Sequence, residues 1–547
     1  MQLCAPMKLR AVMLVGVLTL AASPAKADVV AGLNMGAPVW NGVVAKDALA
    51  ASIATGAPQI RVNFRLDEWS SPKDATKHDG RTFFEAYDAI VDAITSQGLE
   101  VYGLLGDELV GVGTKDAGFD DAWVPNALAV VEHFKDRVRV WETINEPNNW
   151  DETQTARMPP VAFARAHAKL YDAVKTSHPK DACWDVALVT GPLFSFDGTT
   201  GTDYLASAIA AGRAGGPWKA IVDATGRDPI DGVGYHVYVA QGTDTPVANV
   251  GGATNANLDA LRAMLAARGL GDRKVWLSEV GFRAQVLGAQ GQADRLDATF
   301  DALAARTDVA AAHWFTIADF GADESWGLFG GGFAPAQQRP AHAKFVARAK
   351  AHAPGLAARI KVVAPATIAK GETATVKVTV TNLGKETWPA AGNVRLGAAA
   401  GCPAASAVNE LPWSAPAPSD GYVKSATDAR VMLPRAVAQG ESVELDVGLA
   451  PTEAGRFAVR MVKEGEAWFG ATASATVTVA TSAPPMTTTP PSTAPNDPRG
   501  DERSRSNVPV ANEGGCRASA RSSSTPTSWL PLLFAVGVVL VFVRRST

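Results

Sequence analysis

The chain has 547 residues, more than one domain usually holds, so we expect one large domain, at least one smaller domain and some unfolded sequence. Hydrophobic residues make up 47% of the chain, which allows a large core. The 51 Lys and Arg residues do not outnumber the 55 Asp and Glu residues, the formal charge is -4, and no basic stripe stands out. This balance excludes nucleic acid as an expected partner.

Residues 1–27 have the pattern of a secretory signal peptide. Lys8 and Arg10 precede an apolar run, and Ala25-Lys26-Ala27 offers the small residues of a cleavage site. Cys4 lies ahead of the apolar run and would leave with this segment. We therefore predict an exported protein whose folded part begins at residue 28.

Residues 28–354 alternate between short apolar runs and amphipathic stretches, a pattern typical of parallel strands covered by helices. One stretch has Tyr87, Ile90 and Ile94 at helical spacing, and another carries His167, which we expect at the surface or in a groove. Strands are expected at 29–35, 59–64, 100–106, 138–146, 186–193, 231–238, 274–282 and 309–319. Eight strand and helix units predict an α/β fold, a (β/α)8 TIM barrel rather than a doubly wound sheet.

Residues 360–480 change to alternation with a period of two, as in Val376, Val378 and Val380, which predicts a small all-β sandwich after the barrel. Segments 378–388 and 460–470 resemble the immunoglobulin-like NBR central-type modules of bacterial surface proteins. The resemblance implies an Ig-like domain and says little about a ligand.

Residues 481–528 are rich in Pro, Thr, Ser and charge, so we expect a flexible stalk. Within the final segment, 529–547, an apolar run of 15 residues ends at Arg544 and Arg545. At ~1.5 Å per residue this run reaches about 22 Å, short of a hydrocarbon core of ~30 Å. With Gly514-Gly515-Cys516 ahead of it, the tail resembles the MYXO-CTERM sorting tail of myxobacterial exported proteins. The resemblance implies delivery to the cell surface or medium; the alternative is a retained C-terminal anchor.

The cysteines that remain after the signal peptide are Cys183, Cys402 and Cys516, and they fall in three different regions. Their spacing predicts neither a disulfide framework nor a metal site. The sequence also lacks a phosphate-binding glycine loop and a serine nucleophile elbow, and we expect no cofactor and no metal.

Two glutamates follow apolar strands of the predicted barrel. Glu146 ends the fourth strand in Asn145-Glu146-Pro147, and Glu279 lies in the seventh, in Leu277-Ser278-Glu279-Val280. Active sites of such barrels form where the strands end, so both carboxyl groups are expected at one mouth. Glycoside hydrolysis needs two such groups, one protonated to donate to the leaving oxygen and one ionised.

These residues, together with His236-Val237-Tyr238 on the sixth strand, resemble glycoside hydrolase clan A, especially families 5 and 39. The resemblance covers all eight strands and implies that Glu146 is the general acid/base and Glu279 the nucleophile of a retaining enzyme. Strand three lacks a histidine that many family 5 enzymes place there, which leaves the subfamily and substrate open.

The same resemblance implies roles for five further residues in substrate binding. Asn145 would bind the sugar 2-hydroxyl group. Arg61 and Tyr238 would hold Glu279 and keep it ionised, and His236 would touch a sugar hydroxyl or orient a neighbour. Trp314, on the eighth strand, would form the aromatic floor under the cleaved sugar.

Other residues near the strand ends have a less specific meaning. Glu142 is expected deeper in the barrel, in a structural role, whereas Asp107 and Glu108 could line the mouth. Several tryptophans fall in predicted rim loops, where each is as suited to loop packing as to stacking on sugars, and together they favour endo action: Trp40, Trp69, Trp123, Trp150 and Trp326.

We therefore predict a monomeric, exported glycosidase that hydrolyses a polysaccharide or oligosaccharide with β-linkages and meets a membrane only through its C-terminal tail. Two alternatives remain open. One is an exo-acting enzyme such as a β-xylosidase. The other is a non-catalytic carbohydrate-binding or adhesive surface protein in which the sandwich does the binding.

Overall fold

The computed structural model describes residues 29–110, 118–135, 137–149, 158–176, 186–195, 200–321, 324–399, 411, 413–416, 422–423 and 429–480. The predicted signal peptide, stalk and C-terminal tail lie outside these residues, as do Trp150, Cys183, Cys402 and Cys516. Within the part of the chain that is described, no helix is both long and apolar enough to cross a membrane.

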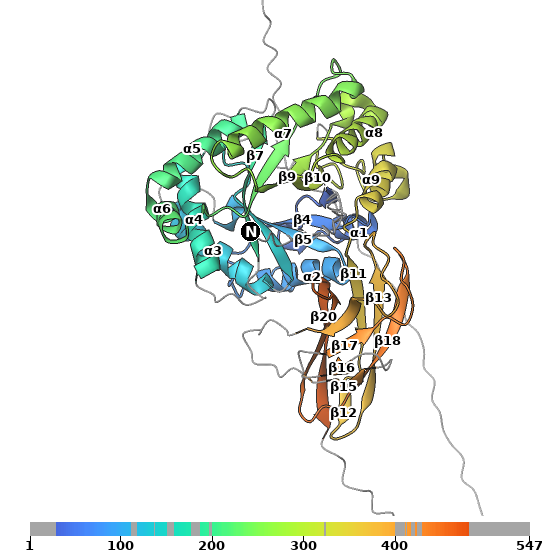
Figure 1. Cartoon of the computed structure of the whole chain (residues 1–547). Helices are drawn as coiled ribbons and strands as arrows, with labels where there is room; N and C mark the ends of the chain where they lie inside the picture. Colours follow the sequence, from blue (N-terminus) through green and yellow to red (C-terminus); the bar gives the residue numbers. More distant parts are fainter. Residues whose placement is uncertain are drawn as a thin grey trace, which may run out of the picture.

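Eight parallel strands form a closed barrel, which confirms the predicted fold class (Figure 1). They neighbour one another in chain order, and the last pairs with the first to close the ring. The strands are β1 (Val30–Asn34), β4 (Gln59–Phe64), β5 (Glu100–Leu105), β6 (Val138–Thr143), β7 (Ala187–Ser195), β8 (Gly232–Val237), β9 (Lys274–Val280) and β10 (Val309–Phe315). A short hairpin of β2 (Val39–Trp40) and β3 (Val43–Val44) follows β1.

Helices surround the barrel and bury their apolar faces against its outer surface (Figure 1). At the start of α2 (Phe83–Thr95), the Thr82 hydroxyl accepts from the Glu85 backbone N–H, and the Glu85 carboxylate accepts from the Thr82 N–H. This reciprocal cap defines where the helix begins. The helices are α1 (Lys46–Ala54), α2 (Phe83–Thr95), α3 (Phe119–Phe134), α4 (Pro160–Thr176), α5 (Thr200–Ala214), α6 (Gly216–Thr225), α7 (Val250–Ala266), α8 (Ala284–Leu303) and α9 (Pro340–Ala351).

His167 on α4 is fully buried, so the prediction of a surface or groove histidine is wrong. Its Nδ1 lies 2.9 Å from the Thr143 hydroxyl and its Nε2 lies 2.7 Å from the Pro229 carbonyl oxygen. Burial lowers the pKa of His167 to about 4, so the ring is neutral at neutral pH. Both ring nitrogens have partners, and the side chain serves packing of α4 on the barrel.

After the barrel, two β-sheets pack face to face around a second core (Figure 1). Alternate residues such as Val376, Val378 and Val380 from one sheet meet Phe457 and Val459 from the other. The first sheet has the order β11 (Ala358–Val363), β13 (Ala374–Asn382), β18 (Ser442–Leu449), β15 (Trp413–Pro416). The second has the order β12 (Thr367–Ala369), β20 (Ala467–Ala480), β19 (Gly455–Lys463), β14 (Val394–Ala398), β17 (Ala429–Met432), β16 (Tyr422–Val423).

The sandwich meets the barrel at the end where the barrel strands begin. Arg359 at the start of β11 donates to the Gln97 side chain, 3.2 Å away, just after α2. A Cβ added to Gly98 would lie 2.7 Å from the Ala358 carbonyl oxygen, so the two backbones approach closely here. Because the proposed catalytic residues follow the opposite ends of these strands, the sandwich leaves that mouth open.

Phe64 tests the packing between strands and helices. Its ring is fully buried and lies 4.7 Å from the ring of Tyr87 and 5.1 Å from that of Trp141. Phe64→Ala should lower the free energy of unfolding by about 3–5 kcal/mol, measured by urea denaturation. As the control, Val161→Ala on the surface of α4, where the residue is 54% exposed, should change it by less than about 0.5 kcal/mol.

Candidate active site

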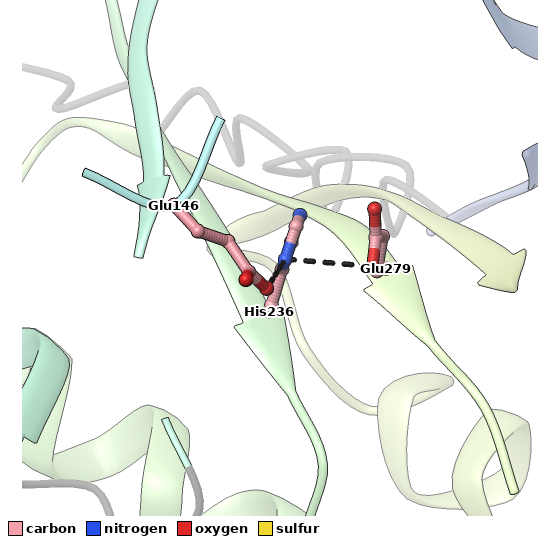
Figure 2. Close-up of side chains that lie close together, drawn as sticks. All are labelled: Glu146, His236 and Glu279. Atoms are coloured by element: carbon pink, nitrogen blue, oxygen red, sulfur yellow. Dashed lines mark hydrogen bonds and ion pairs between the residues drawn. The ribbon is translucent and has the colours of Figure 1, made fainter. Parts of the chain in front are cut away.

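Glu146, His236 and Glu279 come together at the mouth of the barrel (Figure 2). His236 lies between the two carboxyl groups, with Nδ1 2.6 Å from Glu146 Oε1 and 3.5 Å from Glu279 Oε2. One oxygen of each carboxyl group and one nitrogen of the ring all lie within 4.8 Å of one another. The structure thus brings together two acids that are 133 residues apart in the sequence.

Glu146 lies beyond the end of its strand, not on it as predicted. Strand β6 stops at Thr143, and Ile144 and Glu146 have φ angles of 49° and 40°. Positive φ is uncommon for residues other than glycine and rare for a β-branched one, so this turn stores strain of the kind that gathers at functional sites. The Ile144 N–H donates to the Leu105 carbonyl and the Asn149 N–H to the Glu146 carbonyl, each at 2.8 Å. These bonds hold the turn that aims Glu146 across the mouth.

Glu279 is held by three donors. Arg61 Nη1 lies 2.7 Å from Oε1, the Tyr238 hydroxyl donates to Oε2 at 2.6 Å, and Asn34 Nδ2 donates to Oε1 at 3.4 Å. Burial, then the charge of Glu279, keeps the pKa of Tyr238 well above its ordinary value, so its hydroxyl remains a donor. Glu279 thus has a cation and a neutral hydroxyl donor directly on its two oxygens.

A bulge in β9 turns Glu279 toward the mouth. Tyr235 pairs with Leu277 but the next residue, His236, pairs with Glu279, so Ser278 is an extra residue in the ladder. Ser278 Oγ then donates to Glu142 at 2.6 Å while Glu279 still reaches Arg61. Without the bulge, two successive residues of a strand would point to opposite faces.

Arg61 links the nucleophile candidate to the barrel interior. Its Nε donates to Glu142 Oε2 at 3.0 Å, and its Nη2 donates to Asn145 Oδ1 at 2.9 Å. Burial alone would lower the pKa of Arg61, but the charges of Glu142 and Glu279 outweigh it and raise the pKa. Tyr102 also donates to Glu142, which is fully buried and has the structural position predicted for it.

Glu146 has a different environment from Glu279. Burial raises the pKa of Glu146 to about 7, against weaker opposing effects from the Asn149 amide, which donates to Oε2 at 3.2 Å, and from the charge of Arg61. Burial also lowers the pKa of His236 to about 4, so its ring is neutral at neutral pH. The site therefore holds one carboxyl group that keeps its proton up to neutral pH beside one that a guanidinium and a hydroxyl group bind directly.

Trp314 does not belong to this site, so its predicted role as the aromatic floor is wrong. Its side chain is fully buried in the main core, next to Phe282. The neighbouring His313 packs against Tyr102 inside the barrel, and because side chains alternate along a strand, Trp314 faces the helices. Phe315, 7% exposed, faces the interior and lies 6.5 Å from the ring of Tyr238.

The predicted rim tryptophans are mostly packing residues. Trp69, Trp123 and Trp326 are at most 3% exposed. Trp326 packs 5.2 Å from the ring of Tyr238, so from a loop after β10 it supports the side chain that binds Glu279. Among the four that lie in the described part of the chain, Trp40 alone is exposed, at 48%, which removes the argument for endo action.

Sequence reasoning missed Asn34, Asn149 and Phe315 as members of the site. Asn149 had a visible signal, because it follows Asn145-Glu146-Pro147 closely on the same loop. Asp107 and Glu108 follow β5 as predicted, and Glu108 accepts from Asn63 Nδ2 at 3.1 Å.

Glu146, His236 and Glu279 are also the group of side chains, among the described residues, that could hold a metal ion. A cation there would compete with Arg61 and Tyr238 for Glu279, whose oxygens they already bind. The charge of the Glu279 carboxylate is thus already balanced by Arg61. These side chains therefore fit a pair of acids better than a metal centre.

Solved structures similar to this chain include glycoside hydrolases of several families. A family 39 glycoside hydrolase from Bacteroides cellulosilyticus WH2 is 15% identical, with a TM-score of 0.38 over 78% of this chain and 81% of its own. A GH10 xylanase from termite gut that contains a bacterial Ig-like domain is 16% identical, with a TM-score of 0.39 over 59% and 76%. A GH5_18 protein from Bifidobacterium longum subsp. infantis is 17% identical, with a TM-score of 0.40 over 56% and 73%. No protein-family model and no curated protein matches the chain.

The raised pKa of Glu146 can be measured directly. Difference infrared spectra should show a protonated carboxyl band that disappears with a midpoint near pH 7, because burial disfavours the ionised form. The band should be missing in Glu146→Gln and retained in the surface variant Glu444→Gln. Loss of the band at the ordinary glutamate pKa of about 4.3 would contradict the assigned environment.

Proposed function

We propose that this chain is a retaining glycoside hydrolase that cleaves O-glycosidic bonds of a β-linked glycan by double displacement. In this proposal Glu146 is the general acid/base and Glu279 the nucleophile. The observation that carries it is the pair of carboxyl groups, which have one oxygen each within 4.8 Å of the other and different binding partners. Retaining enzymes have such groups about 5–5.5 Å apart, whereas inverting enzymes leave about 6.5–9.5 Å for a water molecule.

In the first step, Glu279 attacks the anomeric carbon while Glu146 gives its proton to the leaving oxygen. A covalent glycosyl ester on Glu279 forms as the glycosidic bond breaks. Arg61 and Tyr238 hold the attacking carboxylate in place, since both bind it at hydrogen-bond distance. Because burial raises its pKa, Glu146 still carries a proton to donate at neutral pH.

In the second step, Glu146, now ionised, takes a proton from water, and the oxygen of that water replaces Glu279 at the anomeric carbon. The two displacements together keep the configuration of the sugar. His236 contacts both carboxyl groups and is neutral, so it can exchange a hydrogen bond with Glu146 in either protonation state without adding a charge.

Asn145 fits the contact to the sugar 2-hydroxyl group. Arg61 occupies its Oδ1, which turns the amide and leaves its N–H groups as the donors toward a substrate. Phe315, which is 7% exposed and packs with Tyr238 and Trp326, takes over the aromatic floor that was assigned to Trp314.

The cellular setting is part of the same proposal and is supported by sequence. The signal-peptide pattern of residues 1–27 and the tail of residues 529–547 support export to the cell surface or medium, with contact to a membrane through that tail alone. We propose a monomer that acts on extracellular polysaccharide or oligosaccharide.

Two variants separate the roles of the glutamates. Glu146→Ala should slow hydrolysis of unactivated β-glycans by about 10²–10⁴-fold, because the leaving oxygen is no longer protonated. With dinitrophenyl β-glycosides, whose leaving group needs no proton, azide should restore turnover and give a glycosyl azide of retained configuration. In Glu279→Ala, azide attacks the substrate directly and should give the inverted product.

The control is Glu444→Gln on the sandwich, which should keep full activity. Mass spectrometry after incubation with a panel of fluorosugar inactivators should place the trapped sugar on Glu279. Wild-type activity in Glu279→Ala would contradict the mechanism. Glycan binding by the chain without hydrolysis of any panel member would favour the alternative of a non-catalytic binding protein.

The pH profile provides a second test. Activity should fall as the pH rises through about 7, because the working form of Glu146 is protonated. The Asn149 hydrogen bond stabilises the ionised form, so Asn149→Ala should raise the pKa and move this limb upward by about 0.7 pH unit, for a bond of about 1 kcal/mol. A downward shift in kcat/KM profiles would contradict the assignment.

A further inference from the structure

The short hairpin at the barrel mouth carries an exposed apolar face. Within it, Val39 pairs with Val44, and both side chains are buried. Trp40 pairs with Val43, and these side chains are 48% and 46% exposed. Large hydrophobic side chains with such exposure are few in the described part of the chain, and here two of them are neighbours. Apolar side chains gathered on one exposed surface are a sign of a binding site.

The hairpin is fixed in place by its turn. Asn41 and Gly42 have φ angles of 49° and 71°, the left-handed pair that suits a two-residue turn between twisted strands. The Gly42 N–H donates to Asp67 Oδ2 at 2.6 Å, and a Cβ on Gly42 would collide with the His78 side chain. Asp67 and His78 both belong to the loop after β4. Trp40 is therefore held in position before a ligand arrives, which lowers the entropy cost of binding.

The hairpin and its anchor both follow strands that hold the candidate nucleophile. The hairpin comes after β1, whose last residue, Asn34, donates to Glu279. The anchoring loop comes after β4, where Arg61 binds the same carboxylate. The two strands are neighbours in the barrel, and Asn34 pairs with Arg61. Trp40 therefore lies at the rim above two strands whose side chains bind Glu279.

Arg65 connects Trp40 to β4. Its guanidinium lies over the indole ring, 5.8 Å from the ring centre, which orients the ring. Arg65 comes four residues after Arg61, which is about 13 Å farther along the chain at ~3.3 Å per residue. This distance is longer than one sugar residue. A sugar stacked on Trp40 is therefore not the one that Glu279 attacks but a later one in the same glycan chain.

Asn145 indicates which part of a glycan reaches Trp40. In the proposed function its amide binds the 2-hydroxyl group of the sugar that Glu279 attacks, and Arg61 on β4 holds that amide. The attacked sugar thus lies on the β1 and β4 side of the mouth, whereas β7 and β8 lie across the ring of strands. The leaving part extends toward β7 and β8, so Trp40 meets the part that stays on the enzyme.

We propose that Trp40 and Val43 form a binding subsite for a distant sugar of the glycone, the part of the glycan that becomes attached to Glu279. This inference rests on the proposed function and narrows its substrate to a chain of several sugars. The C–H groups on one face of a sugar ring can stack on an indole. Because that sugar is remote from the cleaved bond, its binding energy can be used to raise kcat/KM of long substrates.

Chromogenic substrates that share one leaving group test the proposal. The probes are 4-nitrophenyl β-glycosides of glucose, galactose, mannose and xylose, each with a glycone of one to five sugars, and release of 4-nitrophenol is measured. In the series that the wild type hydrolyses, kcat/KM should rise at least about tenfold from the shortest glycone to a longer one, because remote binding energy acts at the cleaved bond. Trp40→Ala should remove most of this rise, so that short and long glycones become nearly equal substrates.

The matched control is Trp468→Ala, which removes another exposed tryptophan, 39% exposed, from the sandwich. It should leave the dependence on glycone length unchanged. A rise that persists in Trp40→Ala, or a wild type that hydrolyses all lengths equally well, would overturn the proposal while leaving the proposed function intact. Failure to hydrolyse any member of the four series would instead contradict the proposed function, and this inference with it.

Discussion

The site depends on one buried cation. Arg61 binds Glu142 on β6, Asn145 in the loop after β6, and Glu279 on β9. It thereby connects separate parts of the barrel across its axis. Two carboxylates around one guanidinium would leave excess negative charge in a desolvated space. Tyr102 and Ser278 reduce that cost by donating to Glu142. The network is stable as a complete set, and removal of one member leaves the others buried without partners.

This network also explains how two glutamate side chains at one mouth have different surroundings. Arg61 is nearest to Glu279, and Tyr238 completes the binding of that carboxylate. Glu146 has a distant effect from Arg61, one amide donor and the neutral ring of His236 beside it, so burial dominates its pKa. The ring of His236 lies between the two carboxyl groups and separates them. Because the ring is neutral, it adds no charge of its own.

Sequence predicted the barrel well because its strands alternate with helices in a regular order, and strand-end carboxylates of a parallel barrel must share one mouth. The prediction from sequence was wrong where a shift of one residue along a strand decides which side chain faces the barrel interior. Strands buried on both faces are apolar throughout, so Trp314 and Phe315 cannot be assigned to inside or outside from hydrophobicity. The bulge at Ser278 and the positive φ of Glu146 are likewise results of tertiary pairing that leave no local pattern.

The direction of β20 determines how the barrel would be presented if the chain were tethered at its C-terminal side. This strand passes close to the start of β11 at Gly470 and ends at Ala480, where it pairs with β12 at the far end of the sandwich (Figure 1). At ~3.3 Å per residue, that stretch extends about 33 Å away from the barrel. In such a tethered chain the sandwich would act as a spacer, and the barrel mouth would lie on the side away from the attachment, where long polymers could reach it.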